Sequence, residues 1–302
     1  MSTTRTFTRQ DTTFESQGTS CAAWLYRPEG VQSPPIVVMG HGFAATRELR
    51  LDAYAERFAQ AGLAVLVFDY RDWGDSAGEP RRVLDIGMQH QDWRAAVAQA
   101  RTLPDVDTER VVAWGSSFGG GHVLHLAAED HDIAAVIAQV PHVSGPASAF
   151  SASPRQTLRL ALAGLRDQIG AVFGRPPYRV AAVGKPGTLA MMTSPDAYPL
   201  AERLAAGNIE KFLRENDVAA RIALRLPLYS PGRRGKRITA PTLVQVAEHD
   251  VVTPVHVAVK AAKRIPGAEI HTYDCSHFEP YLEPHFDSVV SDQVAFLART
   301  LA

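Results

Sequence analysis

The chain has 302 residues, of which 46% are hydrophobic and 21% charged, a composition typical of a folded globular protein. Lys and Arg number 31 and Asp and Glu 32, so the formal net charge of -1 provides no general attraction to nucleic acid or to an anionic membrane. The 2 cysteines, Cys21 and Cys275, exclude a disulfide framework and a four-cysteine zinc site.

The first half of the chain alternates short apolar runs with stretches of helical periodicity. Strands are predicted at residues 35–39, 63–68, 110–114 and 133–140, and helices near residues 51–59, 93–100 and 122–128. Apolar strands separated by helices are typical of a parallel sheet that is covered on both faces.

Residues 141–237 interrupt this alternation, because no buried strand is predicted there. A helical stripe consists of Leu158, Ala161, Leu162, Leu165 and Ile169, and a loop rich in Gly and Pro follows at residues 174–187. Strands then resume at 242–246 and 268–273, with helices at 255–265 and after residue 285. We predict an α/β fold, a mostly parallel, doubly wound sheet formed by residues 1–140 and 238–302, with residues 141–237 as an inserted helical cap.

Residues 115–119, Gly-Ser-Ser-Phe-Gly, lie between a predicted strand and a predicted helix. This context is the one in which a Gly-x-Ser-x-Gly turn exposes a nucleophilic serine. Ser117 fits the frame, whereas Ser116 would be flanked by Trp114 and Phe118. The Phe118 N–H at the helix start is a candidate donor to an oxyanion. A phosphate-binding loop is excluded because no lysine follows the glycines.

A nucleophilic serine requires a base, and the position of a histidine decides among the 11 present. His277 follows the last predicted strand, at the sheet edge where the serine turn also lies. His271 lies inside that strand, His285 begins the final helix, and His122 and His125 are expected to pack or to face solvent. We therefore predict that His277 is the base.

An acid must orient the histidine, and residues 246–254 provide two candidates. Asp250 lies in the loop between a strand end and a helix start, which Thr253 and Pro254 mark. Glu248 is nearer the strand, where a side chain has less freedom to reach. Asp250 is the predicted acid, and the chain order serine, acid, histidine is that of α/β hydrolases.

The sequence resembles the α/β-hydrolase superfamily from about residue 22 to the end. Residues 39–43, Met-Gly-His-Gly-Phe, are similar to the oxyanion turn of that superfamily, a resemblance that implies the Phe43 N–H as the second donor. Residues 69–80 resemble the corresponding loop of the dienelactone-hydrolase-like and Xaa-Pro-peptidase-like branches, although Asp72 replaces the usual glycine. Substrate contacts are expected from His41, Tyr178, Met191 and Met192. Further apolar side chains of the insert expected to line the pocket are Phe150, Leu165, Phe173 and Leu226.

The expected function is that of a serine hydrolase that cleaves a carboxylic ester or thioester with a small-to-medium hydrophobic acyl group. A peptidase or amidase, a C–C bond hydrolase and a non-catalytic ligand-binding protein remain alternatives. No cofactor or metal is implied, and the expected partner is a small-molecule substrate.

No nucleic-acid partner is expected, because the basic run at residues 233–237 is short and lacks interleaved aromatic residues. No membrane partner is expected either, because no apolar run approaches the roughly 18 residues that a membrane span needs. The polar residues 1–17 lack the apolar region of a signal peptide, so a cytoplasmic location is expected. A homodimer is left open.

Overall fold

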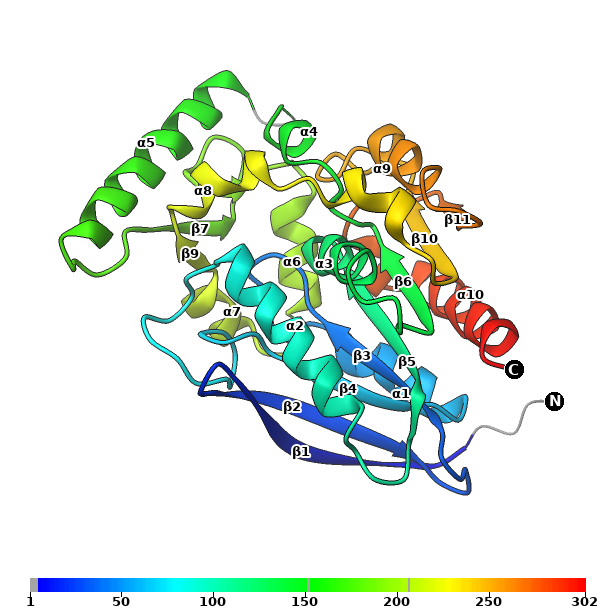
Figure 1. Cartoon of the computed structure of the whole chain (residues 1–302). Coiled ribbons are helices and arrows are strands. Elements are labelled where there is room, and N and C mark those ends of the chain that lie inside the picture. The colour runs from blue at the N-terminus through cyan, green and yellow to red at the C-terminus, as the bar shows by residue number, and fades with distance from the viewer. Residues whose placement is uncertain (1–4, 151–152, 206) are drawn as a thin grey trace.

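The computed structural model describes residues 5–150, 153–205 and 207–302. A central 8-stranded sheet has the strand order β1-β2-β4-β3-β5-β6-β10-β11 (Figure 1). Its strands from β4 to β11 in that order are parallel, whereas β2 runs antiparallel to both β1 and β4. The predicted mostly parallel sheet is confirmed. Its strands are β1 (Phe7–Ser16), β2 (Thr19–Pro28), β3 (Pro35–Gly40), β4 (Ala64–Phe68), β5 (Asp107–Ser116), β6 (Ala135–Gln139), β10 (Thr242–Ala247) and β11 (Glu269–Tyr273).

Helices cover both faces of this sheet. One face is covered by α2 (Ile86–Ala100), α3 (Phe118–Ala127) and α9 (Val255–Ala262), and the other by α1 (Leu51–Gln60) and α10 (His285–Thr300) (Figure 1). Alternate side chains of β3 enter the two cores: Val38 packs with α2 and α3, whereas Val37 packs with α1 and α10. Burial on both faces explains why this strand is apolar at successive positions.

The β1–β2 hairpin was not predicted from the sequence. β1 is an edge strand whose residues are mostly polar and exposed, and only every other residue near its end, such as Phe14, is buried. The turn consists of Gln17 and Gly18, both with positive φ, as a two-residue hairpin requires. A polar edge strand lacks the apolar run by which the central strands are recognised.

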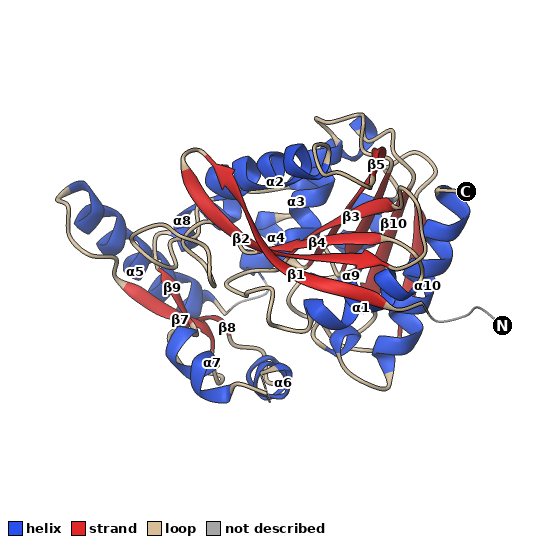
Figure 2. Cartoon of the chain, turned by 90° about the horizontal axis from the view of Figure 1, so that it is seen from below, coloured by secondary structure: helices blue, strands red, loops and turns tan. Residues whose placement is uncertain are grey.

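The insert, residues 141–237, contains strands as well as helices, so the prediction that it lacks strands was wrong. A 3-stranded sheet of order β8-β7-β9 is built from β7 (Arg179–Val183), β8 (Ala190–Met192) and β9 (Asp217–Ala219). These strands are too short to show a period in the sequence. Figure 2 shows the insert gathered at one end of the central sheet. Its helices are α4 (Gly145–Phe150), α5 (Pro154–Val172), α6 (Ala197–Leu204), α7 (Ile209–Glu215) and α8 (Ile222–Arg225), with 3-10 turns η1 (Leu226–Leu228) and η2 (Pro231–Arg237); a third such turn, η3 (Glu279–Tyr281), precedes α10.

Helix α5 packs on the insert through a buried carboxylate. Asp167 Oδ1 accepts hydrogen bonds from Tyr178 N and Arg221 Nη2, and Oδ2 accepts from Arg221 N and Nε, at distances of 2.7–3.0 Å. Burial opposes ionisation of Asp167, but the bonds and the charge of Arg221 lower the pKa of its carboxyl. This interaction turns the face with Leu160, Ala163 and Asp167 inward.

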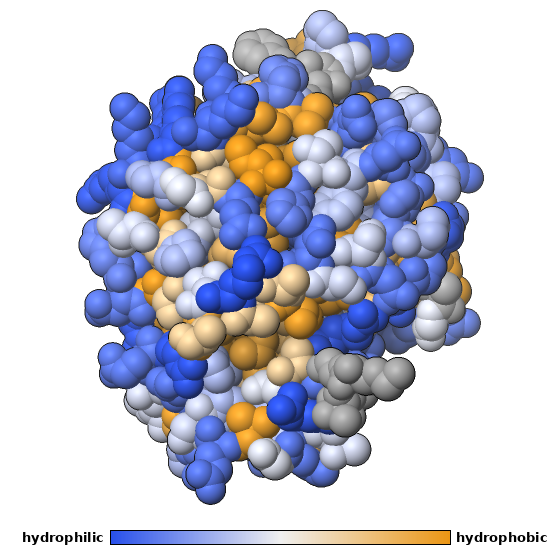
Figure 3. All heavy atoms as spheres, turned by 90° about the vertical axis from the view of Figure 1, so that its right-hand side faces the viewer, coloured by the Kyte–Doolittle hydropathy of each residue, from blue (hydrophilic) through white to orange (hydrophobic). Residues whose placement is uncertain are grey.

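Ion pairs connect the insert to the core. Asp217 Oδ1 accepts from Arg82 Nε at 2.7 Å, and Lys211 Nζ donates to Glu48 Oε2 at 2.6 Å. Among the described residues, none of the helices is both long and apolar enough to cross a membrane. The face with α9 and α10, seen in Figure 3, consists mainly of hydrophilic side chains with apolar groups between them.

Candidate active site

Ser117 lies at a strained turn between β5 and α3. Its φ of 56° and ψ of -117° place it in a backbone region that residues other than glycine rarely adopt. Ser117 N donates to Gln139 O at 2.9 Å, and Ser117 O accepts from His142 N at 2.8 Å, so β6 and the residues after it hold the turn. The local geometry is that of the predicted nucleophile turn.

Both glycines of the motif are required by close backbone approach. A Cβ on Gly115 would lie 2.2 Å from Gly119 O, and a Cβ on Gly119 would lie 2.6 Å from His41 O. Contacts this short exclude any side chain at either position. The motif therefore brings the start of α3 against β5 and against the loop that follows β3.

The structure brings the three predicted catalytic side chains together. His277 Nε2 lies 2.9 Å from Ser117 Oγ, and His277 Nδ1 lies 2.6 Å from Asp250 Oδ2. His277 and Asp250 are only 2% and 7% exposed. Asp250 follows β10 and His277 follows β11, so both lie at the carboxyl edge of the parallel sheet, beside the turn after β5.

Asp250 is fixed by the loop in which it lies. Its Oδ1 accepts from Val252 N at 2.8 Å and Thr253 N at 2.6 Å, and its Oδ2 accepts from Thr253 Oγ1 at 2.8 Å. Burial alone would raise the pKa of Asp250, but the charge and hydrogen bond of His277, with the Thr253 donors, hold it below its usual value. The carboxylate therefore stays ionised and faces His277 Nδ1. Glu248, the alternative acid, is exposed.

The loop after β3 reaches Ser117 through Gly42. A Cβ on Gly42 would lie 3.1 Å from Ser117 Cβ and 3.2 Å from Ser116 O, so the backbone passes directly beside the serine. The Phe43 ring packs edge-on against that of Phe118, with centroids 5.7 Å apart. The two segments with the predicted oxyanion donors, the N–H groups of Phe43 and Phe118, therefore meet beside Ser117.

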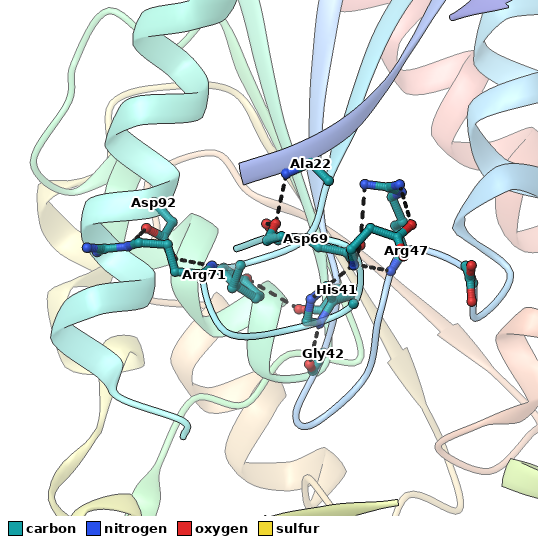
Figure 4. A network of polar contacts seen from close by, with 12 residues as sticks. Ala22, His41, Gly42, Arg47, Asp69, Arg71 and Asp92 are labelled. Atoms are coloured by element: carbon teal, nitrogen blue, oxygen red, sulfur yellow. Dashed lines mark hydrogen bonds and ion pairs between the residues drawn. The ribbon is translucent and has the colours of Figure 1, made fainter. Parts of the chain in front are cut away.

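A buried polar network holds this loop (Figure 4). Asp69 Oδ1 accepts from Arg47 N at 2.8 Å, and Asp69 Oδ2 lies 3.3 Å from Arg47 Nη1. Burial raises the pKa of Asp69 to about 6, against the opposing charge of Arg47. The carboxyl group ties the loop after β3 to the end of β4.

His41 belongs to this network and lines neither of the two cavities described below, which corrects its expected contact with substrate. Its ring packs against the Tyr70 ring, its Nδ1 lies 3.0 Å from Gly42 O, and only 1% of the residue is exposed. Burial lowers the pKa of His41 to about 4, so the ring is neutral. It supports the Gly42 turn from inside the protein.

Asp72, which replaces the glycine of the resembling branches, adopts a φ of 69°. Asp72 N donates to Ala77 O and Asp72 O accepts from Arg82 N, each at 2.9 Å. The loop therefore has a left-handed conformation at this position, which glycine adopts without strain.

Ser117 opens into a chamber of about 450 Å³. Met191, Met192 and Leu226 line it, as predicted, together with Phe43 and Phe118. None of the described residues that line it is Asp, Glu, Lys or Arg. The chamber therefore suits an uncharged group of a ligand.

Three other expected contacts are corrected. Tyr178 lies instead under the Arg166 guanidinium, 3.9 Å from its ring centroid. Leu165 and Phe173 are 50% and 73% exposed, because α5 turns its other face inward. The side chain of Phe150 lies outside the described residues.

His142 also lines the chamber and was missed by the sequence analysis. It follows the end of β6, and a polar residue just after a buried parallel strand is the signal that could have identified it. Its Nε2 lies 3.2 Å from Tyr229 O and its Nδ1 3.2 Å from Ser148 Oγ. Burial lowers the pKa of His142 to about 4, so the ring is neutral at pH 7.

His142 is expected to make folding stability depend on pH. The pKa of His142 is 6.5 in the unfolded chain and about 4 in the folded protein. Between these two pH values the unfolded chain binds a proton that the folded protein excludes, so the free energy of unfolding falls as the pH falls. Above pH 6.5 the ring is neutral in both states. Relative to His142→Gln, the wild type should lose about 3 kcal/mol more between pH 7 and pH 4. Urea denaturation across this range measures the difference, and parallel stability curves would contradict the assignment.

A second cavity, of about 400 Å³, shares Phe43 and Met192 with the first. Phe278, which directly follows His277, also lines it. Charged side chains are prominent in its wall: Glu48, Arg50, Asp52, Arg81, Arg82, Lys211 and Glu215. Two cavities that differ in charge therefore lie next to each other, and Ser117 lines the uncharged one. Within the part of the chain that the structure describes, no cluster of three or more His, Cys, Asp or Glu side chains could hold a metal ion.

Comparison with known proteins agrees with the fold and this geometry. A family model described as serine aminopeptidase, S33, matches residues 32–173. The crystal structure of the α/β hydrolase GrgF from Penicillium sp. sh18 superposes with a TM-score of 0.79 at 23% sequence identity, covering 97% of this chain and 99% of that one. The chain belongs to the α/β-hydrolase superfamily, a family of enzymes.

Its similarity to one curated protein extends over nearly the full length. The chain is 45% identical over 291 residues to the quorum-quenching protein AidA of Acinetobacter baumannii (strain MDR-ZJ06), covering 96% of this chain and 94% of the relative. It is also 36% identical over 112 residues to the thiohydrolase aneE of Aspergillus aculeatus, covering 37% of this chain and 35% of that protein.

Proposed function

We propose that the protein is a serine hydrolase that cleaves a carboxylic ester or thioester through an acyl-enzyme on Ser117. The observation that carries this proposal is the continuous chain of contacts from Ser117 Oγ to His277 Nε2 at 2.9 Å and from His277 Nδ1 to Asp250 Oδ2 at 2.6 Å. Such a relay removes a proton from a serine hydroxyl and returns it to a leaving group.

In the first half of the reaction, His277 Nε2 takes the proton as Ser117 Oγ attacks the substrate carbonyl carbon. The tetrahedral oxyanion accepts hydrogen bonds from the Phe43 and Phe118 N–H groups. Removing one such donor typically raises the activation free energy by about 3 kcal/mol. His277 then donates the proton to the departing oxygen or sulfur. In the second half, His277 takes a proton from water as the water oxygen attacks the acyl carbon. It then returns this proton to Ser117 Oγ as the C–O bond to the serine breaks and the acid is released.

The different linings of the two cavities favour different parts of the substrate, the acyl group in one and the leaving group in the other. The chamber at Ser117 has no charged side chain among its described lining residues, which favours an uncharged acyl group. The second cavity has charged walls and is lined by Phe278, the residue after His277, which favours a polar leaving group there. An aminopeptidase would need a carboxylate beside Ser117 to bind the substrate ammonium, and the lining gives no support for one.

Covalent labelling tests the proposal directly. A fluorophosphonate probe should modify the purified protein at Ser117, and p-nitrophenyl esters and N-acetylcysteamine thioesters of uncharged acyl groups should be hydrolysed. A protein that remains unlabelled and turns over neither series would favour the non-catalytic ligand-binding alternative.

Gly42 provides a test of the oxyanion turn. The added methyl group of Gly42→Ala would lie 3.1 Å from Ser117 Cβ, so the turn must move away from the serine. A displacement of this kind is expected to lower kcat by about 100-fold. The matched control is Gly170→Ala in α5, where the new methyl group makes only an ordinary contact of 3.7 Å. Equal kcat values for the two variants would contradict the role of this turn.

A further inference from the structure

An apolar ridge runs along the solvent side of α5. It consists of six side chains, hereafter the α5 ridge, with exposed fractions of 50–75%: Leu158, Leu162, Leu165, Ile169, Val172 and Phe173. The steps from Leu158 to Val172 are four, three, four and three residues, so these side chains share one face of the helix. Single exposed apolar residues are ordinary, but a continuous row of this kind marks an interaction surface.

Packing within the chain does not explain the ridge. The opposite face of α5 already packs on the insert, through Leu160, Ala163 and the Asp167–Arg221 interaction. Figure 1 shows α5 at the outer edge of the molecule, on the side away from both termini. The ridge therefore lies on the outside of the insert, with its side chains in solvent.

The exposed charges of α5 and of the loop that follows it are all positive. Arg155, Arg166 and Arg175 are exposed, Arg159 is half-buried, and Asp167 is the single acidic residue between residues 153 and 185. Because Asp167 is buried and paired with Arg221, it does not balance these arginines. An amphipathic helix with an apolar face and a basic flank is attracted to an anionic surface.

A second copy of the chain fits the ridge less well. On the helix, Arg155, Arg159 and Arg166 lie along one flank, whereas Ala161 and Gln168 lie along the other. An antiparallel pair would place arginine flank on arginine flank, and a parallel pair would place it against neutral residues. Neither arrangement pairs the arginines with acids.

We propose that the α5 ridge binds the surface of a lipid bilayer that contains anionic phospholipids. The leucine, isoleucine, valine and phenylalanine side chains enter the boundary of the acyl chains, and the arginines contact the phosphate groups. The expectation of no membrane partner rested on the lack of a long apolar run and on the net charge of -1. The first criterion detects only helices that cross a bilayer, and the second averages over the chain and hides this local basic surface. Helix α5 lies along the bilayer rather than across it.

The N-terminal end of α5, where the ridge begins, adjoins the chamber of Ser117. Ser153, the N-cap of α5, lines that chamber, as does Gly187, whose carbonyl accepts from Arg159 Nη1 at 2.9 Å. Membrane binding would therefore bring the chamber close to apolar esters dissolved in the bilayer. This consequence rests on the proposed hydrolase function, whereas the binding itself does not.

Sedimentation with vesicles tests the binding without any enzymatic assay. The full chain is mixed either with vesicles of phosphatidylcholine alone or with vesicles of phosphatidylcholine that contain about 30% phosphatidylglycerol. The fraction of protein that sediments with the vesicles is measured. Binding should require phosphatidylglycerol and weaken with salt. Leu162→Glu combined with Ile169→Glu should reduce the partition coefficient more than about 10-fold, and Arg155→Gln and Arg166→Gln about 5-fold each.

The matched control is Ile209→Glu combined with Leu213→Glu, because these residues are also exposed apolar side chains of an insert helix, at 37% and 56%. This control should bind vesicles like the wild type, and all variants should keep the wild-type circular dichroism spectrum. The proposal would be overturned if the wild-type protein did not bind anionic vesicles, or if the ridge variants bound them as strongly as the wild type. A wild-type dimer that the ridge variant dissociates would overturn it in favour of a second copy.

Discussion

Replacing Ser117 with alanine is expected to abolish ester and thioester hydrolysis, lowering kcat by about 10⁵–10⁶-fold. The hydroxyl lies 2.9 Å from His277 Nε2 and is the nucleophile of the proposed reaction. Without it, the oxyanion donors and the histidine remain, but no acyl-enzyme forms. Steady-state rates with p-nitrophenyl esters and intact-mass analysis after fluorophosphonate treatment measure both losses.

The neighbouring serine provides the control for this experiment. Ser116 is also buried, but its Oγ accepts a hydrogen bond from Gln139 Nε2 at 3.1 Å. Ser116→Ala should therefore retain hydrolysis and labelling to within a small factor. Wild-type turnover by Ser117→Ala, or loss of labelling in Ser116→Ala alone, would show that the nucleophile has been wrongly assigned.

Replacing Asp250 with asparagine is expected to lower kcat by about 10⁴-fold. Val252 N and Thr253 N donate to Oδ1, so the amide oxygen of the asparagine should remain on that side. The amide nitrogen would then face His277 Nδ1, which would have to accept a hydrogen bond. This moves the ring proton to Nε2, where it prevents the histidine from accepting the proton of Ser117.

Glu248→Gln is the matched control, because it makes the same chemical change in the same loop at an exposed position. It should leave kcat within a factor of about two, as surface substitutions away from a site do. Single-turnover kinetics of acylation separate an effect on the relay from an effect on substrate binding. Equal rates for Asp250→Asn and wild type would contradict the proposed role of the carboxylate.

Some features could be predicted because their causes lie close together in the sequence. The central strands are apolar at successive positions because both faces of the sheet are covered, and they were located to within a few residues. The turn at Ser117 was predicted because Gly115 and Gly119 meet each other within five residues of chain. Asp250 and His277 were placed by a topological rule, since loops after parallel strands end at one edge.

Other features could not be predicted, since they depend on partners distant in the chain. His41 was expected to contact substrate, but it lies buried inside the protein against the Tyr70 ring. The sheet of the insert is built from three short strands, and neither length nor period distinguishes such strands from loops. His142 lines the chamber because it follows the end of β6, and no sequence motif includes this histidine.

Helix α5 shows this division most clearly. The sequence by itself indicated a helical stripe from Leu158 to Ile169, because periodicity is a property of neighbouring residues, and the structure places this stripe on the helix Pro154–Val172. Only the tertiary structure decided which face is buried: Asp167 requires the donors of Tyr178 and Arg221, so the leucine face was left in solvent. Likewise, the serine turn follows from local sterics, whereas the 2.9 Å contact with His277 joins residues 160 positions apart and depends on how the whole sheet is assembled.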